Sequence, residues 1–283
     1  SAWAPTIKFP FYPGYSNVGT IVEVGKNVEA SFLGRRVLAL AGHVKYFKLP
    51  INSDDLMLVP DGVEPDEAVF GVIAQITSGS VRISGIQPGD TVAVFGAGLI
   101  GQFVSRFAKL AGAIKIFVAD VSDMRLNKLP GDPCFIKVNT MIDDIAEVIK
   151  NNNNGELARV VFETTSVPAL IEKEIGCLAK RGLLIITSSP KAKSVIDFDY
   201  ISRRGITIIG AQNFAIHTPV ATPEDPWTRK RDSEYYLELL DKKQLFTKDM
   251  ITHRASFKDA PDIYKMLMED RTRALAVHLY WGN

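Results

Sequence analysis

Apolar and polar positions follow two different patterns along the chain, and the change occurs near residue 73. Before it, segments such as 17–25 (NVGTIVEVG) and 43–50 (HVKYFKLP) alternate apolar with polar residues between glycines and prolines, which is typical of short β-strands. Beyond it, short apolar segments alternate with helical patterns. The strands predicted there are residues 91–95, 115–119, 158–162, 183–187 and 206–210. Such alternation of strands and helices predicts βαβ units and a doubly wound parallel sheet.

The clearest predicted helix follows the strand at 91–95. Apolar residues recur there at helical spacing, namely Ile100, Phe103, Val104, Phe107, Ala108 and Ala111. We expect this face to pack on the sheet. The opposite face is expected to meet solvent, and it carries Gln102, Ser105, Arg106 and Lys109. After residue 210 the pattern predicts a proline-bearing loop, helices near 230–241 and 258–269, and a last strand near 274–281.

A glycine-rich turn joins the strand at 91–95 to this helix. Gly96, Gly98 and Gly101 have the spacing G-x-G-x-x-G, with Leu99 and Ile100 between the last two. The first glycine permits a tight turn, the second lets the backbone approach a pyrophosphate, and the third lets helix and strand pack closely. The N–H groups at the helix N-terminus then face the phosphates. This strand–turn–helix context predicts a dinucleotide-binding Rossmann domain.

The next predicted strand ends in Asp120, nineteen positions beyond Gly101. A carboxylate there can accept hydrogen bonds from the hydroxyls of an adenosine ribose, and it repels a 2′-phosphate. NAD(H) is therefore favoured over NADP(H). Arg125 lies five residues further on and keeps NADP(H) open as the alternative. A structural βαβ unit with an accidental glycine pattern is the alternative to nucleotide binding.

Charge and composition narrow the partners. The 283 residues include 33 Lys and Arg against 32 Asp and Glu, for a net charge of +1. This balance gives no global field that would attract nucleic acid or an anionic membrane, so we expect a small-molecule substrate. The chain shows neither a signal-peptide pattern at residue 1 nor an uninterrupted apolar span. Its two cysteines, Cys134 and Cys177, fit a reducing compartment, and we expect a cytoplasmic protein.

Taken together, these segments resemble the medium-chain dehydrogenase/reductase superfamily, whose best-known branch is the zinc alcohol and polyol dehydrogenases. The resemblance rests on YPGYSNVGTIVEVGKNV, GRRVLAL, KYFKLP, a linker helix near Ala74, GAGLIG and ITHRASFKDAPDIYKML. It implies an α/β fold: a Rossmann doubly wound parallel sheet plus a GroES-like β-rich substrate domain. The implied boundaries are 1–73 and 212–283 for the substrate domain and 74–211 for the Rossmann domain. The N-terminal part of the substrate domain is then expected upstream of Ser1.

The chain departs from the superfamily's zinc members at their ligand positions. Those members carry a G-H-E-x-x-G segment, and residues 14–19 here read GYSNVG, with Tyr15 and Ser16 at the His and Glu positions. Zinc sites use thiolate, imidazole or carboxylate, so neither residue is a suitable ligand. Residues 70–75 (FGVIAQ) supply no third ligand, and the four-cysteine structural zinc lobe is absent. The resemblance therefore implies a member without zinc, with the first ligand position upstream of Ser1.

Hydride transfer to a carbonyl needs a group that stabilises the developing negative charge, and removing one such group costs ~10²–10³ in rate. Tyr15 and Ser16 occupy the positions of metal ligands, so the resemblance places them on the nicotinamide side of the active site. His43 is a further candidate for acid–base catalysis. The structural alternatives are a packed Tyr15 bonded to backbone and a His43 that belongs only to a surface loop.

The resemblance also implies further cofactor contacts, most of them hydroxyl residues at strand ends or at the start of the linker helix. They are Thr77, Thr164, Thr165, Ser166, Thr187, Ser188 and Ser189. The three that follow the strand at 158–162 are expected along the adenosine ribose. Four residues are expected near the nicotinamide: Thr77, Thr187, Ser188 and Ser189. Arg273 matches a position that often reaches the pyrophosphate.

The leading hypothesis is NAD(H)-dependent interconversion of a secondary alcohol, such as a polyol or cyclitol, and a ketone. Zinc-free reduction of an activated C=C bond is the second hypothesis, although its usual preference for NADPH disagrees with Asp120. A nucleotide-binding relative without catalytic activity is the third. The superfamily commonly forms dimers through the edge of the Rossmann sheet, so a homodimer is expected.

Overall fold

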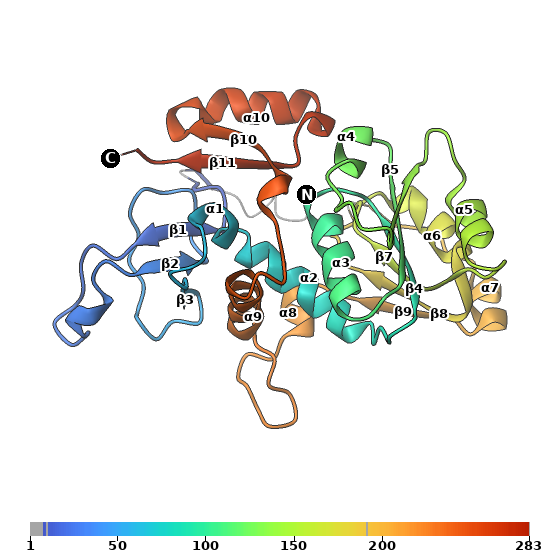
Figure 1. The fold of residues 1–283 in the computed structure, drawn as a ribbon, viewed down its shortest axis with the longest axis horizontal. Coiled ribbons are helices and arrows are strands. Elements are labelled where there is room, and N and C mark those ends of the chain that lie inside the picture. The colour runs from blue at the N-terminus through green and yellow to red at the C-terminus, as the bar shows by residue number, and fades with distance from the viewer. Residues whose placement is uncertain (1–7, 10, 191, 283) are drawn as a thin grey trace. The chain divides into compact units, whose positions relative to one another are not determined.

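The computed structural model describes residues 8–9, 11–190 and 192–282, and the chain forms two compact units (Figure 1). Unit 1 comprises Ser1–Gln75, His217–Glu269 and Ala276–Asn283. Unit 2 comprises Ile76–Ile216 and Asp270–Leu275. The last of these segments lies in unit 2, whereas the sequence pattern places it with the C-terminal part of the substrate domain. It contains a short 3-10 helix, η6 (Arg271–Arg273).

Unit 2 is built on a six-stranded sheet in which every neighbouring pair is parallel. Its strands, in chain order, are β4 (Thr91–Phe95), β5 (Lys115–Asp120), β6 (Phe135–Asn139), β7 (Ala158–Glu163), β8 (Leu178–Ile186) and β9 (Thr207–Gly210). The spatial order is β6-β5-β4-β7-β8-β9. The chain thus leaves β4 towards one edge and later continues from β7 towards the other. The point between β4 and β7 is where open α/β sheets bind ligands, at the carboxyl ends of the strands.

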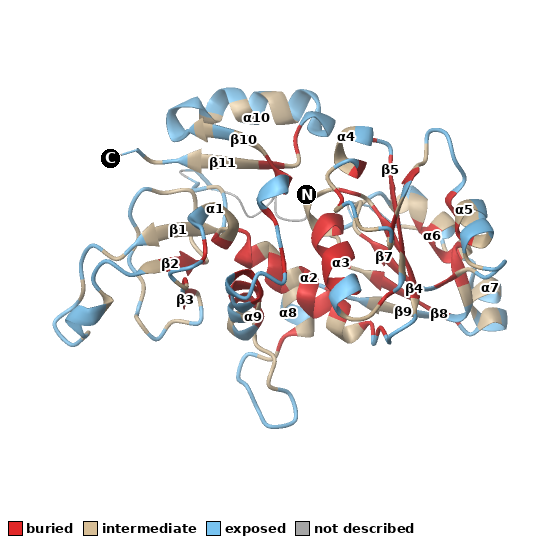
Figure 2. Ribbon diagram, viewed as in Figure 1, coloured by how far each residue is buried: buried red, intermediate tan, exposed pale blue. Residues whose placement is uncertain are grey.

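Helices cover both faces of this sheet. The helices of unit 2 are α3 (Leu99–Leu110), α4 (Asp123–Leu126), α5 (Ile145–Asn152), α6 (Ile171–Gly176), α7 (Phe198–Arg204) and α8 (Asn213–Ile216), with the 3-10 helix η3 (Pro168–Leu170). The connections through α3 and α6 run in opposite directions along the sheet. Because such crossovers are right-handed, these two helices lie on opposite faces. The buried positions concentrate in β4, β5, β7 and α3 (Figure 2). The expected doubly wound parallel sheet is confirmed.

Two features of the sheet differ from the sequence expectations. Strand β6 was not expected, because FIKVN mixes polar with apolar residues. As an edge strand it has one neighbour, so it needs no continuous apolar run. Strand β8 begins at Leu178 instead of near residue 183, and its pairing with β7 shifts register between Ala158 and Val160. Arg181, at φ 63°, interrupts the apolar pattern inside this strand.

The expectation that the polar side of α3 meets solvent is wrong for three of its four residues. Gln102, Ser105 and Arg106 are buried rather than exposed to solvent. The amide nitrogen of Gln102 donates to the carbonyls of Ala97 and Arg125. Arg106 donates to the Gln102 amide oxygen at 2.6 Å and to the Lys128 carbonyl at 3.1 Å. The segment around α4 covers this face of α3 and accepts hydrogen bonds from Gln102 and Arg106, whereas the Ser105 hydroxyl donates to the Gly101 carbonyl of its own helix.

Unit 1 contains two small sheets. Strands β1 (Asn17–Thr20), β2 (Arg36–Ala39) and β3 (Leu56–Leu58) form an antiparallel sheet, and β10 (Ile251–Ser256) pairs in parallel with β11 (Ala276–Tyr280). The helical elements are η2 (Ala30–Phe32), α1 (Pro65–Ala68), α9 (Arg229–Asp241), η4 (Lys248–Met250), η5 (Phe257–Asp259) and α10 (Ala260–Glu269). Helix α2 (Gly71–Ile83) begins in this unit and ends in unit 2. No helix in the described part of the chain is long and apolar enough to cross a membrane.

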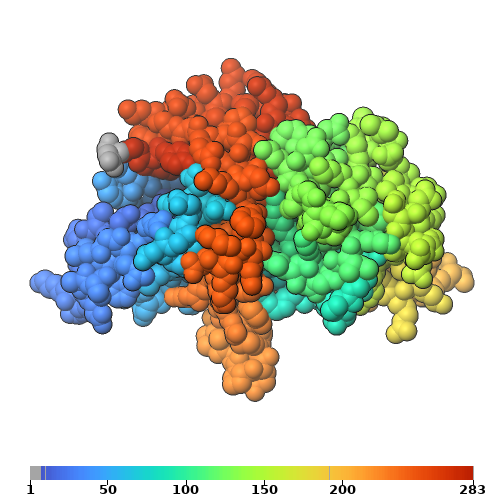
Figure 3. All heavy atoms as spheres, viewed as in Figure 1, coloured from blue at the N-terminus to red at the C-terminus, as the bar shows by residue number. Residues whose placement is uncertain are grey.

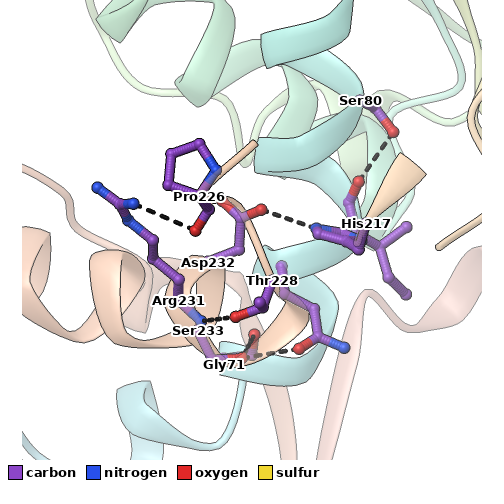
Figure 4. A network of polar contacts seen from close by, with 10 residues as sticks. Gly71, Ser80, His217, Pro226, Thr228, Arg231, Asp232 and Ser233 are labelled. Atoms are coloured by element: carbon purple, nitrogen blue, oxygen red, sulfur yellow. Dashed lines mark hydrogen bonds and ion pairs between the residues drawn. The ribbon is translucent and has the colours of Figure 1, made fainter. Parts of the chain in front are cut away.

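Helix α9 is attached to its unit through buried polar contacts (Figure 4). The ring of His217 faces the carboxylate of Asp232, with Nε2 and Oδ2 2.7 Å apart and both side chains almost inaccessible. The hydroxyl of Ser233 donates to the Gly71 carbonyl and to the amide oxygen of Gln75. Between His217 and α9 the chain forms an exposed loop, the orange lobe that stands out in the space-filling view (Figure 3). The buried contacts at both ends fix this loop to unit 1.

Candidate functional site

The glycine turn between β4 and α3 has the geometry that its sequence predicts. Gly96 has φ 102°, a value that L side chains rarely adopt. A Cβ on Gly101 would lie 1.7 Å from the carbonyl oxygen of Gly96, so helix and turn approach as only glycine permits. A Cβ on Gly98 would meet nothing within 4 Å. Gly98 therefore borders open space, on the side from which a ligand can approach the backbone.

Helix α3 begins directly after this turn, at Leu99, and Gly98 is its N-cap residue. No side chain caps this helix end. The first turn of a helix has N–H groups without intrahelical acceptors and the positive end of the helix dipole. The turn thus presents hydrogen-bond donors that are suited to the phosphates of a dinucleotide.

Asp120 ends β5 beside this turn and is 9% exposed. Its Oδ2 accepts a hydrogen bond from the backbone N–H of Ala97 at 2.7 Å, and its Oδ1 accepts one from Ser122 at 2.9 Å. Each carboxylate oxygen has a further lone pair, so both can still accept from a ribose hydroxyl. The backbone contacts hold a negative charge at the second residue of the glycine turn.

Arg125 is directed towards the 270–275 segment of unit 2. Its Nη2 donates to the backbone carbonyls of Arg271 and Ala274. Its Nε is buried and has no hydrogen-bond partner. Arg125 and Arg273 are both close enough to Asp270 to lower the pKa of that carboxyl, which hydrogen bonds from Thr272 lower most. Arg125 therefore lies beside the short segment that contains Arg273.

The strand ends after β4, β7 and β8 meet at the carboxyl edge of the sheet. The backbone N–H of Thr164 donates to the Phe95 carbonyl at 3.0 Å, and its hydroxyl donates to the same oxygen at 2.6 Å. The N–H groups of Thr187 and Ser188 both donate to the Glu163 carbonyl, at 3.0 and 3.2 Å. Thr164 thus lies beside the start of the glycine turn, and Thr187 and Ser188 lie beside the end of β7.

Two further expected cofactor residues differ in exposure. Thr77 is fully buried on α2, and Ser189 is exposed beyond the end of β8. Thr187 is also buried, and its hydroxyl has no partner. The structure therefore places the glycine turn, Asp120 and the residues of the 164–166 and 187–188 segments together, and leaves the roles of the other expected residues as predictions.

Unit 1 carries the candidate catalytic residues. Tyr15 is 51% exposed, and the partial burial of its phenol raises its pKa, so the hydroxyl stays protonated. The Ser16 hydroxyl donates to the Val69 carbonyl. Of the two, Tyr15 is the residue whose hydroxyl has no described acceptor.

His43 is held from three directions. Its backbone N–H donates to the Pro13 carbonyl at 2.7 Å, and Nδ1 lies 3.2 Å from the Tyr264 hydroxyl. Its ring also packs on Gly14, where a Cβ would lie 2.1 Å from Cδ2. Burial lowers the pKa of His43, which favours the neutral imidazole. A donor hydroxyl at Nδ1 would leave the proton on Nε2.

Residues 100–220 match the family described as "Zinc-binding dehydrogenase". The chain is 22% identical over 306 residues to the sorbitol dehydrogenase of Bacillus subtilis, covering 97% of this chain and 82% of that protein. This similarity agrees with the resemblance to the medium-chain dehydrogenase/reductase superfamily that the sequence motifs carry.

Solved structures have the same fold as this chain. An alcohol dehydrogenase of Escherichia coli CFT073, in complex with NADH, has a TM-score of 0.76 at 18% identity and covers 95% of this chain and 83% of its own. A zinc-binding dehydrogenase of Sinorhizobium meliloti 1021, bound to NADP, has a TM-score of 0.76 at 20% identity and covers 97% and 84%. Both the parallel sheet of unit 2 and the β-rich unit 1 are included in this similarity.

The described residues at 14–19 are not of the kinds that bind zinc. Among them, no group of three or more His, Cys, Asp or Glu side chains lies together as a metal site. The segment at 14–19 offers a phenol and a hydroxyl, and the hydroxyl of Ser16 is bonded to a backbone carbonyl. A phenol and an alcohol are not among the usual zinc ligands, so this segment does not supply the donor set of a zinc site.

Sequence reasoning missed three residues that the structure adds to these sites. Glu163 ends β7 and holds the two loops, Glu174 is buried beside it on α6, and Tyr264 of α10 contacts His43. The acidic end of the apolar run ARVVFE was a visible signal for Glu163. Tyr264 lies 221 positions from His43, and the burial of Glu174 depends on how α6 packs, so neither has a local sequence signal.

Proposed function

We propose that the protein is an NAD(H)-dependent oxidoreductase that interconverts a secondary alcohol, of the polyol or cyclitol class, and the corresponding ketone without zinc. Asp120 is the observation that carries the cofactor choice, because its carboxylate is bonded to the glycine turn. The solved relatives contain NADH in one case and NADP in the other, so the choice depends on this chain's own residues. The substrate class follows the similarity to a sorbitol dehydrogenase.

The residues of unit 2 would hold the dinucleotide. The N–H groups of the turn and of the first turn of α3 would bind the pyrophosphate, and Asp120 would accept from the adenosine ribose. We propose that the 164–166 segment lines the ribose side, that Thr77 and the 187–189 segment line the nicotinamide side, and that Arg273 contacts the pyrophosphate. When bound, the nicotinamide supplies or accepts the hydride, and the chain supplies binding, orientation and proton transfer.

Tyr15 is proposed as the donor that replaces a metal. A neutral phenol can donate a hydrogen bond to the substrate oxygen as negative charge develops there, and its raised pKa keeps the proton in place at neutral pH. Burial lowers the pKa of His43 and favours its neutral imidazole. We propose that this imidazole exchanges the reaction's proton with solvent or substrate. Ser16, already bonded to Val69, is proposed to fix the position of its neighbour Tyr15.

Asp120→Asn tests the cofactor proposal. The amide keeps the size of the side chain and removes its charge, so NADH binding is expected to weaken about tenfold, because one charge-assisted contact is lost. NADPH binding is expected to improve or stay unchanged, since the repulsion of a 2′-phosphate disappears. Nicotinamide fluorescence during titration with each nucleotide measures both. Equal binding of NADH and NADPH by the unmodified protein would refute the proposed preference.

Tyr15→Phe tests the catalytic proposal. Loss of the hydroxyl is expected to lower kcat by ~10²–10³ while the affinity for NADH stays within about twofold, because Tyr15 lies outside unit 2. The assay is NADH formation with a panel of polyols, on protein analysed for zinc. Ser16→Ala is the neighbouring control and is expected to lose much less activity. A Tyr15→Phe enzyme with unchanged kcat would remove Tyr15 from the mechanism.

We also propose a cytoplasmic homodimer. Strand β9 is at the edge of the six-stranded sheet, so its outer backbone groups are available for pairing with a second copy. Light scattering on the purified protein gives the mass, and a monomer at micromolar concentration would refute this arrangement.

A further inference from the structure

The side chain of Glu163 joins two loops at the carboxyl edge of the sheet. It is fully buried at the end of β7. Its Oε1 accepts hydrogen bonds from the backbone N–H of Thr165 at 2.6 Å, the Thr165 hydroxyl at 2.7 Å and the backbone N–H of Ser166 at 2.8 Å. Its Oε2 accepts from the hydroxyl of Ser188, which lies in the loop after β8. One carboxylate therefore collects four donors from two separate loops.

The loop that Glu163 holds is conformationally unfavourable. Ser166 has φ 63°, in the left-handed region that residues with a Cβ seldom adopt. Its own N–H is one of the donors to Glu163 Oε1. Because a surrounding structure must stabilise such a conformation, the hydrogen bond to Glu163 provides a local reason for its persistence.

The same loop reaches the glycine turn. Thr164 donates to the Phe95 carbonyl through both its backbone N–H and its hydroxyl. A Cβ on Gly96 would lie 2.8 Å from that hydroxyl oxygen, so the loop and the turn are packed closely. A displacement of the 164–166 loop would therefore be felt at the turn as well as at Ser188.

Glu174 is a second buried carboxyl near Glu163. Glu174 of α6 is fully buried, and both of its carboxyl oxygens lack a hydrogen-bond partner. Burial, together with the negative charge of Glu163, raises the pKa of Glu174 to about 8. At neutral pH Glu174 is thus mostly protonated, and the four donors at this point are all directed to Glu163.

We propose that Glu163 is a positioning residue of the dinucleotide site, whose carboxylate holds the 164–166 loop and Ser188 in the arrangement that receives the nucleotide. This inference rests on the proposed nucleotide binding by unit 2. Glu163 does not itself contact the nucleotide. It acts through the loops on either side of β7.

Glu163→Gln is the direct test, with NADH as the probe. Glutamine keeps the size but offers one acceptor oxygen and no charge, so it cannot accept from both loops. We expect the Kd for NADH to rise about tenfold or more, because charge-assisted hydrogen bonds are replaced by neutral ones. Glu172→Gln, an exposed position on the same helix as Glu174, is the matched control and is expected to leave Kd unchanged within about twofold.

A second variant separates loop positioning from general damage. Ser166→Gly adopts the left-handed conformation without strain, so in the Glu163→Gln background it is expected to recover at least about threefold of the lost affinity. Ser166→Gly alone supplies the reference Kd against which the double variant is compared. Absence of rescue, or a Glu163→Gln protein that binds NADH as the unmodified protein does, would overturn the proposal.

Amide hydrogen exchange on the nucleotide-free protein gives a readout that does not depend on the proposed function. Glu163→Gln is expected to speed exchange at the amides of Thr165 and Ser166, which donate to Glu163, and not at amides within β4. If the unmodified protein fails to bind NADH, the proposed function fails while exchange still decides whether Glu163 orders the loop. Unchanged exchange at both amides would show that it does not.

Discussion

Gly101→Ala is expected to destabilise unit 2 by about 2–4 kcal/mol and to abolish measurable nucleotide binding. The added Cβ would lie 1.7 Å from the Gly96 carbonyl oxygen and 2.8 Å from its carbon, and both are backbone atoms that cannot rotate away. Helix α3 must therefore move away from the turn. Urea denaturation without nucleotide measures the loss of stability, and titration with NADH measures the loss of affinity.

Gly98→Ala is the matched control for this experiment. Its Cβ would meet nothing within 4 Å, and Gly98 has φ −66°, which alanine adopts readily. The free energy of unfolding should therefore change by less than about 0.5 kcal/mol, the range usual for unstrained substitutions. The affinity for NADH should still fall, because the methyl group enters the space through which a pyrophosphate approaches the backbone. Equal loss of stability in the two variants would contradict the geometry of the turn.

Removing the carboxyl of Glu174 is expected to change how stability depends on pH. The pKa of this group is about 8 in the folded protein and 4.5 as its ordinary value. The folded state therefore binds more protons than the unfolded state between these values. The stabilisation by Glu174 is fully present below its ordinary pKa. It is lost as pH rises through the pKa of the folded protein. The slope is at most about 1.4 kcal/mol per pH unit.

Glu174→Gln should remove this slope. Relative to the variant, the unmodified protein is expected to lose about 2–3 kcal/mol between pH 5.5 and pH 8, measured by urea denaturation at a series of pH values. Glu172→Gln provides the control, because that side chain is exposed and should leave the slope unchanged. Parallel stability curves for the unmodified protein and Glu174→Gln would mean that Glu174 titrates normally in the folded state.

The sequence predicts the sheet of unit 2 well where its strands are buried on both faces. Strand β4 has the predicted bounds, 91–95, because a fully apolar run between turn residues has few alternatives. The sequence-based prediction fails where contacts with distant parts of the chain determine the structure. The edge strand β6 has no continuous apolar run, and the polar face of α3 is covered by the segment around α4. A helical period identifies a polar face but does not show whether backbone carbonyls satisfy it.

The candidate site divides in the same way. The glycine turn and Asp120 follow from local spacing, since turn, strand end and helix start are adjacent in the chain. The role of Glu163 depends on Ser188, which lies 25 positions away in sequence, and the contact of His43 with Tyr264 spans 221 positions. No local pattern encodes such pairs, because they arise only when separate strand ends or helices are brought together. The catalytic roles of Tyr15, Ser16 and His43 stay predictions.

The hydrogen bonds from Arg125 to Arg271 and Ala274 bear on how this protein can be divided for biochemical work. Unit 2 takes its last six residues from the segment Asp270–Leu275, which more than fifty positions separate from the rest of the unit. A fragment ending at Ile216 would lack the carbonyls of Arg271 and Ala274. The guanidinium of Arg125 would then lose both of these acceptors. Anyone excising the Rossmann unit should therefore graft residues 270–275 back onto it, because the unit is not encoded by one continuous stretch of the gene.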